Sequence, residues 1–287
     1  MKIEKILVTG SSGFIGKKIL QHLSKKKLKV YCPARKNKKN YKNIFFFKKN
    51  LQSKVIFNKY CDIIIHGAAK SPYNNKFNSK DYKANILMTE SVIKYSKKFR
   101  PKKIIFLSSL SVHGTILSKE VNEKTKINKP DLYGRSKLIC EKKLLSISKE
   151  IPVVSIRLPG VIGKNSVRNW LTTTLDQIKK NKVISVYNLN QKFNNLIHVD
   201  DLVLFIISLI KFKFKDFNNI YLGTKKPIKI RSIIDLFIKY IKKKEEFKKL
   251  RINKKNFLID YTYARNYFKY KPAFTKTRIV KFINENK

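Results

Sequence analysis

The sequence has few of the residues that stabilise small secreted proteins, and it has no segment suited to crossing a membrane. Only three of its 287 residues are cysteines (Cys32, Cys61 and Cys140), and this odd number argues against a disulfide framework. The longest apolar run, residues 202–210, is far shorter than the ~20 residues that span a bilayer. No signal-peptide pattern precedes the first apolar segment. These absences predict a soluble cytoplasmic protein.

Acidic residues are scarce, and the ligands of a metal site are missing. The chain has 18 acidic and 66 basic residues, which gives a formal net charge of +48. Such a charge can attract nucleic acid, an anionic membrane surface or phosphorylated substrates. The lysines are nevertheless spread along the whole chain, so we favour a compositional bias over a dedicated polyanion site. The four histidines lack the paired spacing of a zinc site, and we expect no metal ion.

Short apolar segments alternate with amphipathic ones along the first part of the chain. This alternation is typical of βα units that build a doubly wound parallel sheet covered on both faces. We therefore predict an α/β fold, with a dinucleotide-binding domain over residues 1–165 and a smaller substrate-binding region over 166–287. Residues 193–225 of the second region are expected to pack back on the first domain. The predicted strands are 6–9, 29–32, 44–47, 63–66, 104–108 and 153–157, and the predicted helices are 14–23, 81–99 and 133–148.

A glycine-rich turn joins the first predicted strand to the first helix. Gly10 permits a tight turn, Gly13 lets the backbone approach a pyrophosphate, and Gly16 allows the helix to pack closely on the strand. The helix N-terminus adds amide donors and a favourable dipole for phosphate groups. A turn of this kind can be purely structural, but its position between a strand and a helix favours a dinucleotide-binding site.

A phenol and an ammonium lie four residues apart in the segment that begins at Tyr133. On a helix Tyr133 and Lys137 share one face. A neighbouring ammonium favours the phenolate, so it brings the phenol toward a pKa that is useful near neutral pH. Tyr133 can then exchange a proton with a substrate hydroxyl or carbonyl. The same pattern occurs on many ordinary helices, and it gains weight here because the glycine turn precedes it.

These segments together resemble the extended short-chain dehydrogenase/reductase family, of the NAD-dependent epimerase/dehydratase type. The spacing Gly10-x-x-Gly13-x-x-Gly16, the turn His66-Gly-Ala-Ala69, the serine-rich segment 106–114 and Tyr133-x-x-x-Lys137 all fit its pattern. Later blocks at 157–160, 197–201 and 260–272 extend the resemblance over nearly the whole chain. The resemblance implies a Rossmann-type fold, an NAD(P) cofactor and a nucleotide-sugar-like anionic substrate, and it leaves a homodimer open.

The resemblance also implies roles for single residues. Ser109 aligns with the catalytic hydroxyl, with Ser108 as the fallback, and Lys137 is expected to hold the nicotinamide ribose as well as to assist Tyr133. Further cofactor contacts are implied at Ser12, Phe14, Ile15, Ala68, Ala69, Asn85 and Pro159. Substrate contacts are implied at Ser111, Gly160, Asn194 and Arg251.

The second predicted strand bears on the choice of cofactor. Near its end no Asp or Glu is present to accept a hydrogen bond from an adenosine ribose, and Arg35 follows instead. Because an arginine can neutralise a 2′-phosphate, we lean to NADP over NAD.

Two departures from the family pattern narrow the chemistry. The 4,6-dehydratases carry an acidic pair directly after the catalytic hydroxyl, where this chain has Leu110 and Ser111, so dehydration is disfavoured. An arginine that commonly grips a diphosphate is replaced by Asn194 or Asn195, although Arg251 can supply a second such contact.

The interpretation we favour is a nucleotide-sugar epimerase or ketoreductase that acts at C4 in cell-surface polysaccharide biosynthesis. One alternative is an NADPH-dependent reductase of another carbonyl substrate. Another is a non-catalytic NADP-binding regulatory protein, against which the intact Tyr133 and Lys137 argue. A polyanion-binding protein is the third, and no specific nucleic-acid partner is expected.

Overall fold

The structure is a computed structural model that describes residues 3–53, 58–72, 76–167, 169–242, 247–249 and 256–287. The chain forms two compact units that interleave along the sequence. The first unit comprises Met1–Gly114, Ile127–Arg157 and Val203–Ile220, and the second comprises Thr115–Lys126, Leu158–Leu202 and Tyr221–Lys287. The ranges 1–165 and 166–287 drawn from the sequence remain a prediction.

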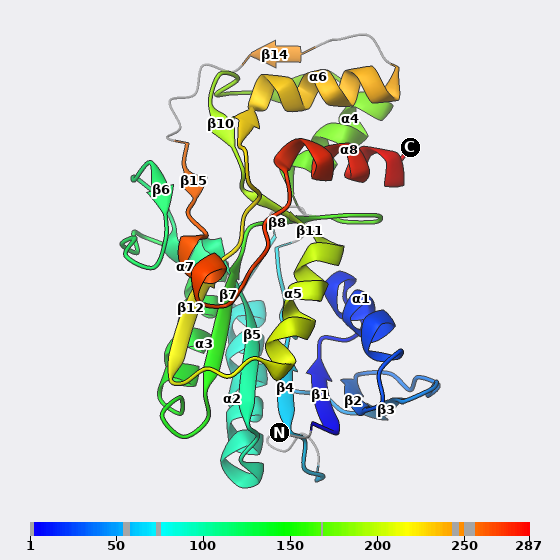
Figure 1. Cartoon of the computed structure of the whole chain (residues 1–287), viewed down its shortest axis with the longest axis vertical. Coiled ribbons are helices and arrows are strands. Elements are labelled where there is room, and N and C mark those ends of the chain that lie inside the picture. The colour runs from blue at the N-terminus through cyan, green and yellow to red at the C-terminus, as the bar shows by residue number, and fades with distance from the viewer. Residues whose placement is uncertain (1–2, 54–57, 73–75, 168, 243–246, 250–255) are drawn as a thin grey trace. The chain divides into compact units, whose positions relative to one another are not determined.

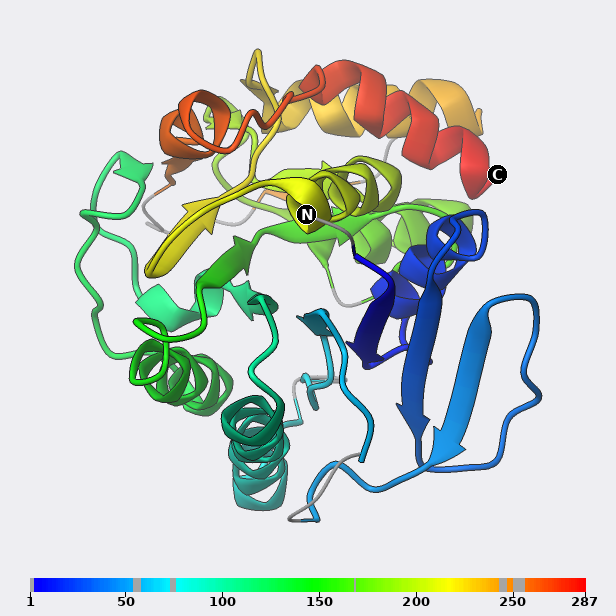
Figure 2. The ribbon, with the colours of Figure 1, turned by 60° about the horizontal axis from the view of Figure 1, so that its bottom comes forward.

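A seven-stranded sheet organises the first unit, with the strand order β12-β7-β5-β4-β1-β2-β3 (Figures 1 and 2). The pairings that join β3, β2, β1, β4 and β5 are all parallel. This order reverses direction between β1 and β4, where doubly wound folds bind their ligands. The strands are β1 (Lys5–Thr9), β2 (Lys29–Ala34), β3 (Ile44–Lys48), β4 (Ile63–His66), β5 (Lys103–Ser109), β7 (Val153–Leu158) and β12 (Phe217–Tyr221).

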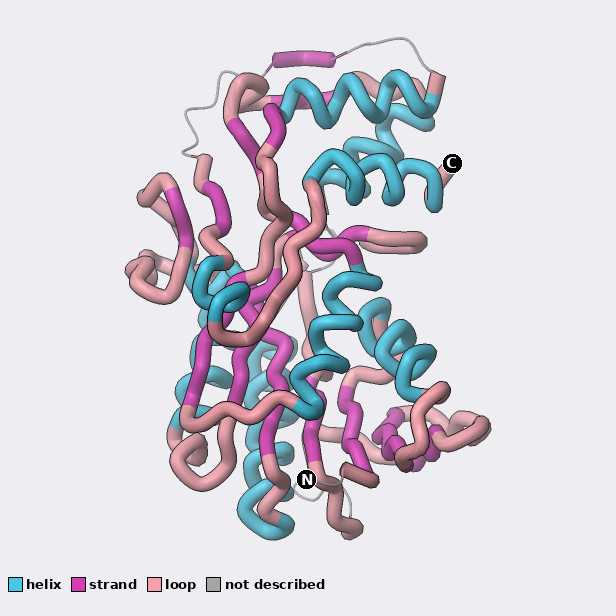
Figure 3. The backbone as a smooth tube through the Cα atoms, in the orientation of Figure 1, coloured by secondary structure: helices cyan, strands magenta, loops and turns pink. Residues whose placement is uncertain are grey.

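Helices cover both faces of this sheet, so its central strands are continuous apolar runs. Ile6, Leu7 and Val8 of β1 are all fully buried, as a strand covered on both faces requires. Helices α2 and α3 pack against each other on one face, and α1 lies on the other (Figures 2 and 3). The doubly wound fold predicted from the sequence is therefore confirmed. The helices are α1 (Phe14–Leu23), α2 (Ser79–Phe99), the 3-10 helix η1 (Leu110–His113), α3 (Leu132–Leu145) and α5 (Val199–Lys211), which runs into the second unit.

Local capping explains where the helices differ from their predicted ends. Helix α2 begins two residues earlier than predicted, because Asn78 and Asp81 form a reciprocal capping box. Asp131 caps α3 by accepting the amide of Gly134 at 2.6 Å. This helix ends at Leu145 rather than residue 148, since Ile147 and Ser148 turn back to the carbonyls of Leu144 and Leu145.

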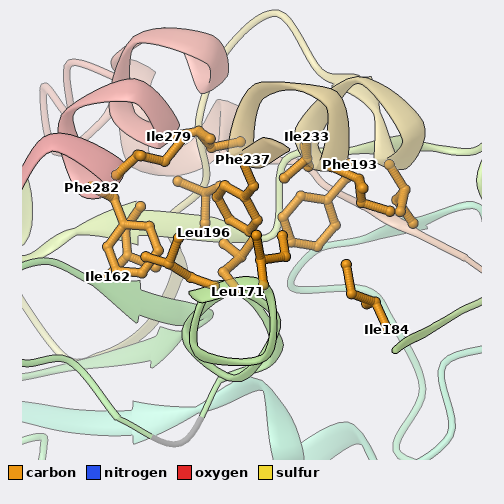
Figure 4. Close-up of a cluster of buried hydrophobic side chains, with 14 of the residues drawn as sticks. Ile162, Leu171, Ile184, Phe193, Leu196, Ile233, Phe237, Ile279 and Phe282 are labelled. Atoms are coloured by element: carbon orange, nitrogen blue, oxygen red, sulfur yellow. The ribbon is translucent and has the colours of Figure 1, made fainter. Parts of the chain in front are cut away.

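The second unit is built from short strands and from α4, α6 and α8 around a core of its own. Apolar side chains from these helices meet those of β8, β9 and β11 (Figure 4). Among the described residues of the whole chain, no helix combines the length and apolar character that a bilayer crossing needs. The elements are β6 (Glu120–Val121), β8 (Gly160–Ile162), α4 (Trp170–Lys179), β9 (Ile184–Val186), β10 (Lys192–Phe193), β11 (Leu196–His198), β13 (Ile228–Lys229), α6 (Ile230–Ile241), β14 (Phe247–Lys249), β15 (Leu258–Ile259), α7 (Thr262–Asn266) and α8 (Thr275–Glu285).

Candidate active site

The glycine turn lies at the carboxyl end of β1 and leads directly into α1. Gly10 has a φ of +73°, and an added Cβ there would lie 2.5 Å from the Gly67 carbonyl carbon, so only glycine fits. Gly13 is the N-cap of α1, and no side chain caps this helix end. The first-turn amides of α1 are therefore suited to an anionic ligand.

A buried hydroxyl supports the same interpretation. Ser11, between Gly10 and Ser12, is 2% exposed; its Oγ interacts with the Cys32 thiol and makes no hydrogen bond to a nitrogen or oxygen atom of the described residues. Buried hydroxyls are normally hydrogen-bonded, so this atom fits a site completed by a ligand. Ser12 is exposed, while Phe14 and Ile15 are half-buried at the start of α1. The turn thus fits the pyrophosphate of a dinucleotide, although the individual contacts remain predictions.

The turn that follows β4 is tied to α3 through Asn85. The side-chain oxygen of Asn85 accepts the Lys70 amide at 2.7 Å, and its Nδ2 donates to the Lys70 carbonyl and to Ser136 Oγ, both at 3.0 Å. Ala68 and Ala69 lie within this turn. Asn85 therefore holds the turn in place, and its predicted contact with the cofactor is not needed to explain its position.

Lys137 and Tyr133 project from the first two turns of α3. The Lys137 Nζ donates to the Leu107 carbonyl oxygen at 2.7 Å and lies 4.8 Å from the centre of the Phe106 ring. Burial lowers the pKa of Lys137 to about 8, against the opposing effects of Cys140 and Glu141. The ring of Tyr133 is half-buried and meets Phe77 edge to face, with ring centres 5.4 Å apart.

Ser109 ends β5 and caps η1. Its Oγ accepts the Ser111 amide and donates to Ser111 Oγ, each at 3.1 Å. Gly134, the residue after Tyr133, packs so closely on η1 that a Cβ there would overlap the Ser111 carbonyl oxygen. The structure therefore brings the start of α3 against the segment that carries Ser109 and Ser111. Catalytic roles for Ser109, Tyr133 and Lys137 remain predictions.

Of the predicted substrate contacts, Ser111 lies in the first unit, and Gly160, Asn194 and Arg251 belong to the second. Asn194 has structural partners there. Its Nδ2 donates to the Ile259 carbonyl at 2.9 Å, and its Oδ1 accepts the Ile259 amide at 2.8 Å. Asn194 thus fastens β15, and its predicted substrate contact stays a prediction, as do those of Gly160 and of the cofactor residue Pro159. Arg251 lies outside the described residues. Arg35 follows β2 in the first unit and is exposed.

Two buried residues beside the predicted catalytic groups had no assigned role in the sequence. Glu141 lies one turn beyond Lys137 on α3, and its carboxylate pairs with Arg157 of β7, with Nη2 and Oε2 2.7 Å apart. The sequence could have singled out Glu141 by its spacing, because residues four apart lie on the same face of a helix and Glu141 therefore shares the face of Tyr133 and Lys137. A buried carboxylate on that face needs a buried partner.

One trio in the described residues has the donor atoms of a metal site. His198, Asp200 and Glu285 of the second unit place one ligand atom each within 4.8 Å of one another. The Lys281 ammonium, however, binds Asp200 at 2.6 Å, and His198 Nδ1 accepts the Asp200 amide at 3.2 Å. These atoms already serve the charge balance and the capping of α5, so we assign no metal to them.

The first unit thus has the architecture of a dinucleotide-binding protein, with a tyrosine and a lysine on α3 beside the carboxyl end of β5. A model of the NAD dependent epimerase/dehydratase family matches residues 6–223, and the chain belongs to this family. The family resemblance inferred from the sequence is confirmed, and the protein is an enzyme of an NAD-dependent type.

Similar proteins cover most of the chain. It is 29% identical to an uncharacterised protein of Methanocaldococcus jannaschii over 96% of its own length and 93% of the relative's. It is also 29% identical to a dTDP-D-glucose 4,6-dehydratase of Dictyostelium discoideum, over 70% of this chain and 54% of that protein. The UDP-glucuronic acid 4-epimerase of Bacillus cereus, solved with NAD, has the same fold, with a TM-score of 0.80, 22% identity and 98% of both chains covered.

Proposed function

We propose that the protein is an NAD(P)-dependent nucleotide-sugar epimerase or ketoreductase that acts at C4 in cell-surface polysaccharide biosynthesis. The observation that carries this proposal is the buried Lys137, anchored to the Leu107 carbonyl one helical turn from Tyr133. Hydrogen bonds to Tyr133 and to a ribose would use the other two protons of this ammonium. The similar Bacillus cereus protein is a 4-epimerase that acts on UDP-glucuronic acid, which supports this substrate class.

The side chains divide the proton chemistry among them. When bound, a nicotinamide accepts or donates a hydride. Tyr133 takes the proton of the sugar hydroxyl during oxidation and returns one to the carbonyl oxygen during reduction. The ammonium of Lys137 favours the phenolate of Tyr133, and Ser109 donates a hydrogen bond to the reacting oxygen. An epimerase performs both half-reactions on opposite faces of the sugar, whereas a reductase performs the second alone.

The residues after Ser109 favour these reactions over dehydration. Elimination of water needs a further acid and base beside the sugar, and Leu110 has no ionisable group while the Ser111 hydroxyl is engaged with Ser109. The similar Dictyostelium dehydratase therefore shares the family of this chain, and we do not extend its reaction to it.

We also propose NADP as the preferred cofactor. The exposed Arg35 follows β2 at the position where an acidic residue would select a free ribose hydroxyl. The buried Ser11 hydroxyl, which makes no hydrogen bond to a nitrogen or oxygen atom of the described residues, lies in the turn after the neighbouring strand β1. An Arg35→Ala variant should weaken NADPH binding about 10- to 100-fold and leave NADH binding unchanged. This range is expected for the loss of one charged contact worth about 1.5–3 kcal/mol, at 1.4 kcal/mol for each tenfold step in affinity. Equal affinities of the wild type for both cofactors would contradict the proposal.

The activity is tested by incubating the protein with UDP-glucose, UDP-galactose or UDP-glucuronic acid and either oxidised cofactor. We expect interconversion of C4 isomers, separated by anion-exchange chromatography, without net change in the absorbance of reduced nicotinamide. Tyr133→Phe should lower the rate at least ~100-fold, the range of general acid–base catalysis. Tyr41→Phe, which alters an exposed tyrosine between β2 and β3, is the matched control.

A second candidate is an NADPH-dependent reductase of another carbonyl substrate. The observation that favours it concerns Asn194, whose side-chain amide is hydrogen-bonded to the Ile259 backbone. The family resemblance places at this position an arginine that commonly binds a diphosphate. Stoichiometric oxidation of NADPH by a ketone substrate would establish this reductase and exclude the epimerase. If Tyr133→Phe retains full activity in both assays, neither candidate is correct.

A further inference from the structure

A buried carboxylate lies on the catalytic face of α3. Glu141 follows Lys137 by four residues and Tyr133 by eight, so the three side chains point from one side of the helix. The Glu141 side chain is 4% exposed and that of Arg157 is 7% exposed. Taking two such charges out of water costs several kcal/mol per ion, and replacing a buried pair by apolar residues is often neutral for stability. A need for stability alone therefore gives little reason for this pair.

The hydrogen bonds of Glu141 reach two strands of the sheet. Its Oε1 accepts from Ser108 Oγ of β5 at 2.6 Å and from Ser155 Oγ of β7 at 2.9 Å. Arg157 Nε donates to the same oxygen at 3.1 Å, and Arg157 Nη2 donates to Oε2 at 2.7 Å. Four donors thus fix the carboxylate, and through it the helix is fixed to the carboxyl end of β5.

The guanidinium of Arg157 extends the network to the other side of Ser109. Its Nη1 lies 3.1 Å from His113 Nε2 in η1. An arginine only donates, so His113 Nε2 accepts and the imidazole carries its hydrogen on Nδ1. Ser108 directly precedes Ser109, and His113 ends the 3-10 helix that Ser109 caps. The pair therefore holds the chain on both sides of Ser109.

We propose that the Glu141–Arg157 pair positions Ser109 relative to Tyr133 and Lys137. The pair acts through its hydrogen bonds to Ser108 and His113. This inference rests on the proposed function, because it gives Ser109 a role in the reaction. Both charged groups are buried, and in this proposal they act through their neighbours and not by contact with the substrate. Their effect is to remove the rotational freedom of the segment that presents the Ser109 hydroxyl, which a preorganised hydrogen-bond donor requires.

Ser108 and Ser155 offer a matched pair of variants. Both hydroxyls are buried and both donate to the same oxygen of Glu141, but only Ser108 adjoins Ser109. Ser108→Ala and Ser155→Ala should lower the melting temperature by similar amounts. Ser108→Ala alone should lower kcat, by about tenfold, because displacing a transition-state donor costs less than the 10²–10³-fold loss on removing it. Ser155→Ala should stay within about twofold of the wild type, and KM for the cofactor should not change in either variant. Ser108→Thr restores the hydroxyl and should recover kcat.

A second measurement follows the position of Ser109 without any activity. The Ser111 amide donates to Ser109 Oγ, so its hydrogen exchange in the protein without added substrate or cofactor reports on that contact. Exchange should accelerate in Ser108→Ala and not in Ser155→Ala. Equal losses of kcat in the two variants, or no loss in either, would overturn the proposal, as would unchanged exchange at Ser111. Full activity of Tyr133→Phe would instead overturn the proposed function, and the exchange result would still decide whether the pair positions Ser109.

Discussion

At the scale of single residues, the hydrogen-bond directions around His66 fix its protonation. Thr9 Oγ1 accepts the Ala68 amide at 3.2 Å and lies 2.7 Å from His66 Nδ1, to which it donates because burial keeps the imidazole neutral and the other ring nitrogen carries the hydrogen. Thr89 Oγ1 donates to the Asn85 carbonyl at 3.1 Å, so it accepts the Nε2 hydrogen of His66 at 3.0 Å. His66 is therefore a neutral imidazole protonated at Nε2. It links β1, β4 and α2 beneath the turn of the candidate cofactor site.

This neutral histidine makes the fold sensitive to acid. Burial, and then the positive charge of Lys137, lowers the pKa of His66 from 6.5 to about 3. As the pH falls, the unfolded chain therefore binds a proton at this histidine before the folded chain does. The stability that neutral His66 contributes is complete above pH 6.5 and is lost as the pH falls toward 3. At pH 4 the loss is about 3 kcal/mol at 1.36 kcal/mol for each pKa unit. Urea unfolding of the wild type and of His66→Gln between pH 7 and pH 4 measures it, since other acid-labile groups cancel in the difference. Parallel pH dependences would show that His66 contributes nothing.

Because glycine is scarce, several other residues adopt the left-handed backbone conformation that glycine normally supplies. The chain has nine glycines, and ten other described residues adopt a positive φ, among them Lys42 in the turn between β2 and β3. The left-handed conformation costs an ordinary residue roughly 1–2 kcal/mol. Lysine stands at several such positions, in keeping with the compositional bias that the sequence indicates.

Lys42→Gly should therefore stabilise the protein. Relief of the strain at φ +50° exceeds the added entropy of the unfolded chain, for a net gain of up to about 1 kcal/mol in unfolding free energy. Lys39→Gly is the control, because Lys39 is also exposed and does not have a positive φ. It should lower stability slightly. Thermal unfolding that ranks the two variants the other way would show that Lys42 is unstrained.

At the scale of elements, a buried lysine caps the end of α5. The Lys103 Nζ donates to the Leu209 carbonyl at 3.3 Å and to the carbonyl of Phe212, and it lies 5.0 Å from the centre of the Phe214 ring. The last carbonyls of a helix lack partners within it, and an ammonium also complements the dipole there. This contact joins the first residue of β5 to a helix about a hundred residues further along the chain.

The capping lysine should give the protein a stability gain at alkaline pH. Burial lowers the pKa of Lys103 from 10.5 to about 8, so the unfolded chain binds more protons between these values and stability rises with pH across that window. Between pH 8 and pH 10.5, the unfolding free energy of the wild type should rise by no more than about 3 kcal/mol relative to that of Lys103→Met. Chemical unfolding at both pH values measures the gain. A difference that does not change with pH would mean that Lys103 keeps its ordinary pKa in the fold.

Most elements of the first unit could be predicted from local pattern, and their ends could not. The strand predicted over 29–32 stops before Pro33, yet β2 continues to Ala34, although proline is rarely found in a central strand. The pairing explains this difference: β1 meets β2 only as far as Tyr31, while β3 accompanies β2 to Ala34. Pro33 is thus paired on one side alone. Which neighbours a strand has is a property of the sheet, and sequence periodicity does not contain it.

At the scale of the whole molecule, positive charge dominates the surface. Even if every acidic residue paired with a basic one, 48 positive charges would remain. Like charges at this density repel one another in the compact state, and salt screens them over about 10 Å at 0.1 M and about 3 Å at 1 M. The charge therefore opposes folding most strongly at low ionic strength.

The melting temperature should accordingly rise by several degrees from low salt to 0.5 M sodium chloride. A gain of 1 kcal/mol in unfolding free energy raises the melting temperature of a small domain by about 4–8 °C, and that of a chain of this size by less. Binding to random-sequence DNA should fall steeply over the same range and show no sequence preference, as compositional bias implies. A constant melting temperature would show that repulsion is already neutralised within the fold. Sequence-selective DNA binding that survives the added salt would revive the polyanion-binding alternative.

The sequence by itself determined the alternation of strands and helices, the glycine turn, and the shared helical face of Tyr133 and Lys137. These features depend on residues within one or two turns of each other, where periodicity dictates geometry. Only the tertiary structure revealed the partners of Glu141, His66, Lys103 and Asn194, which lie between 14 and 109 positions away in the sequence. Such contacts depend on the order of strands in the sheet and on which helix covers which face, and both are decided by the packing of the whole core rather than by any local stretch of residues.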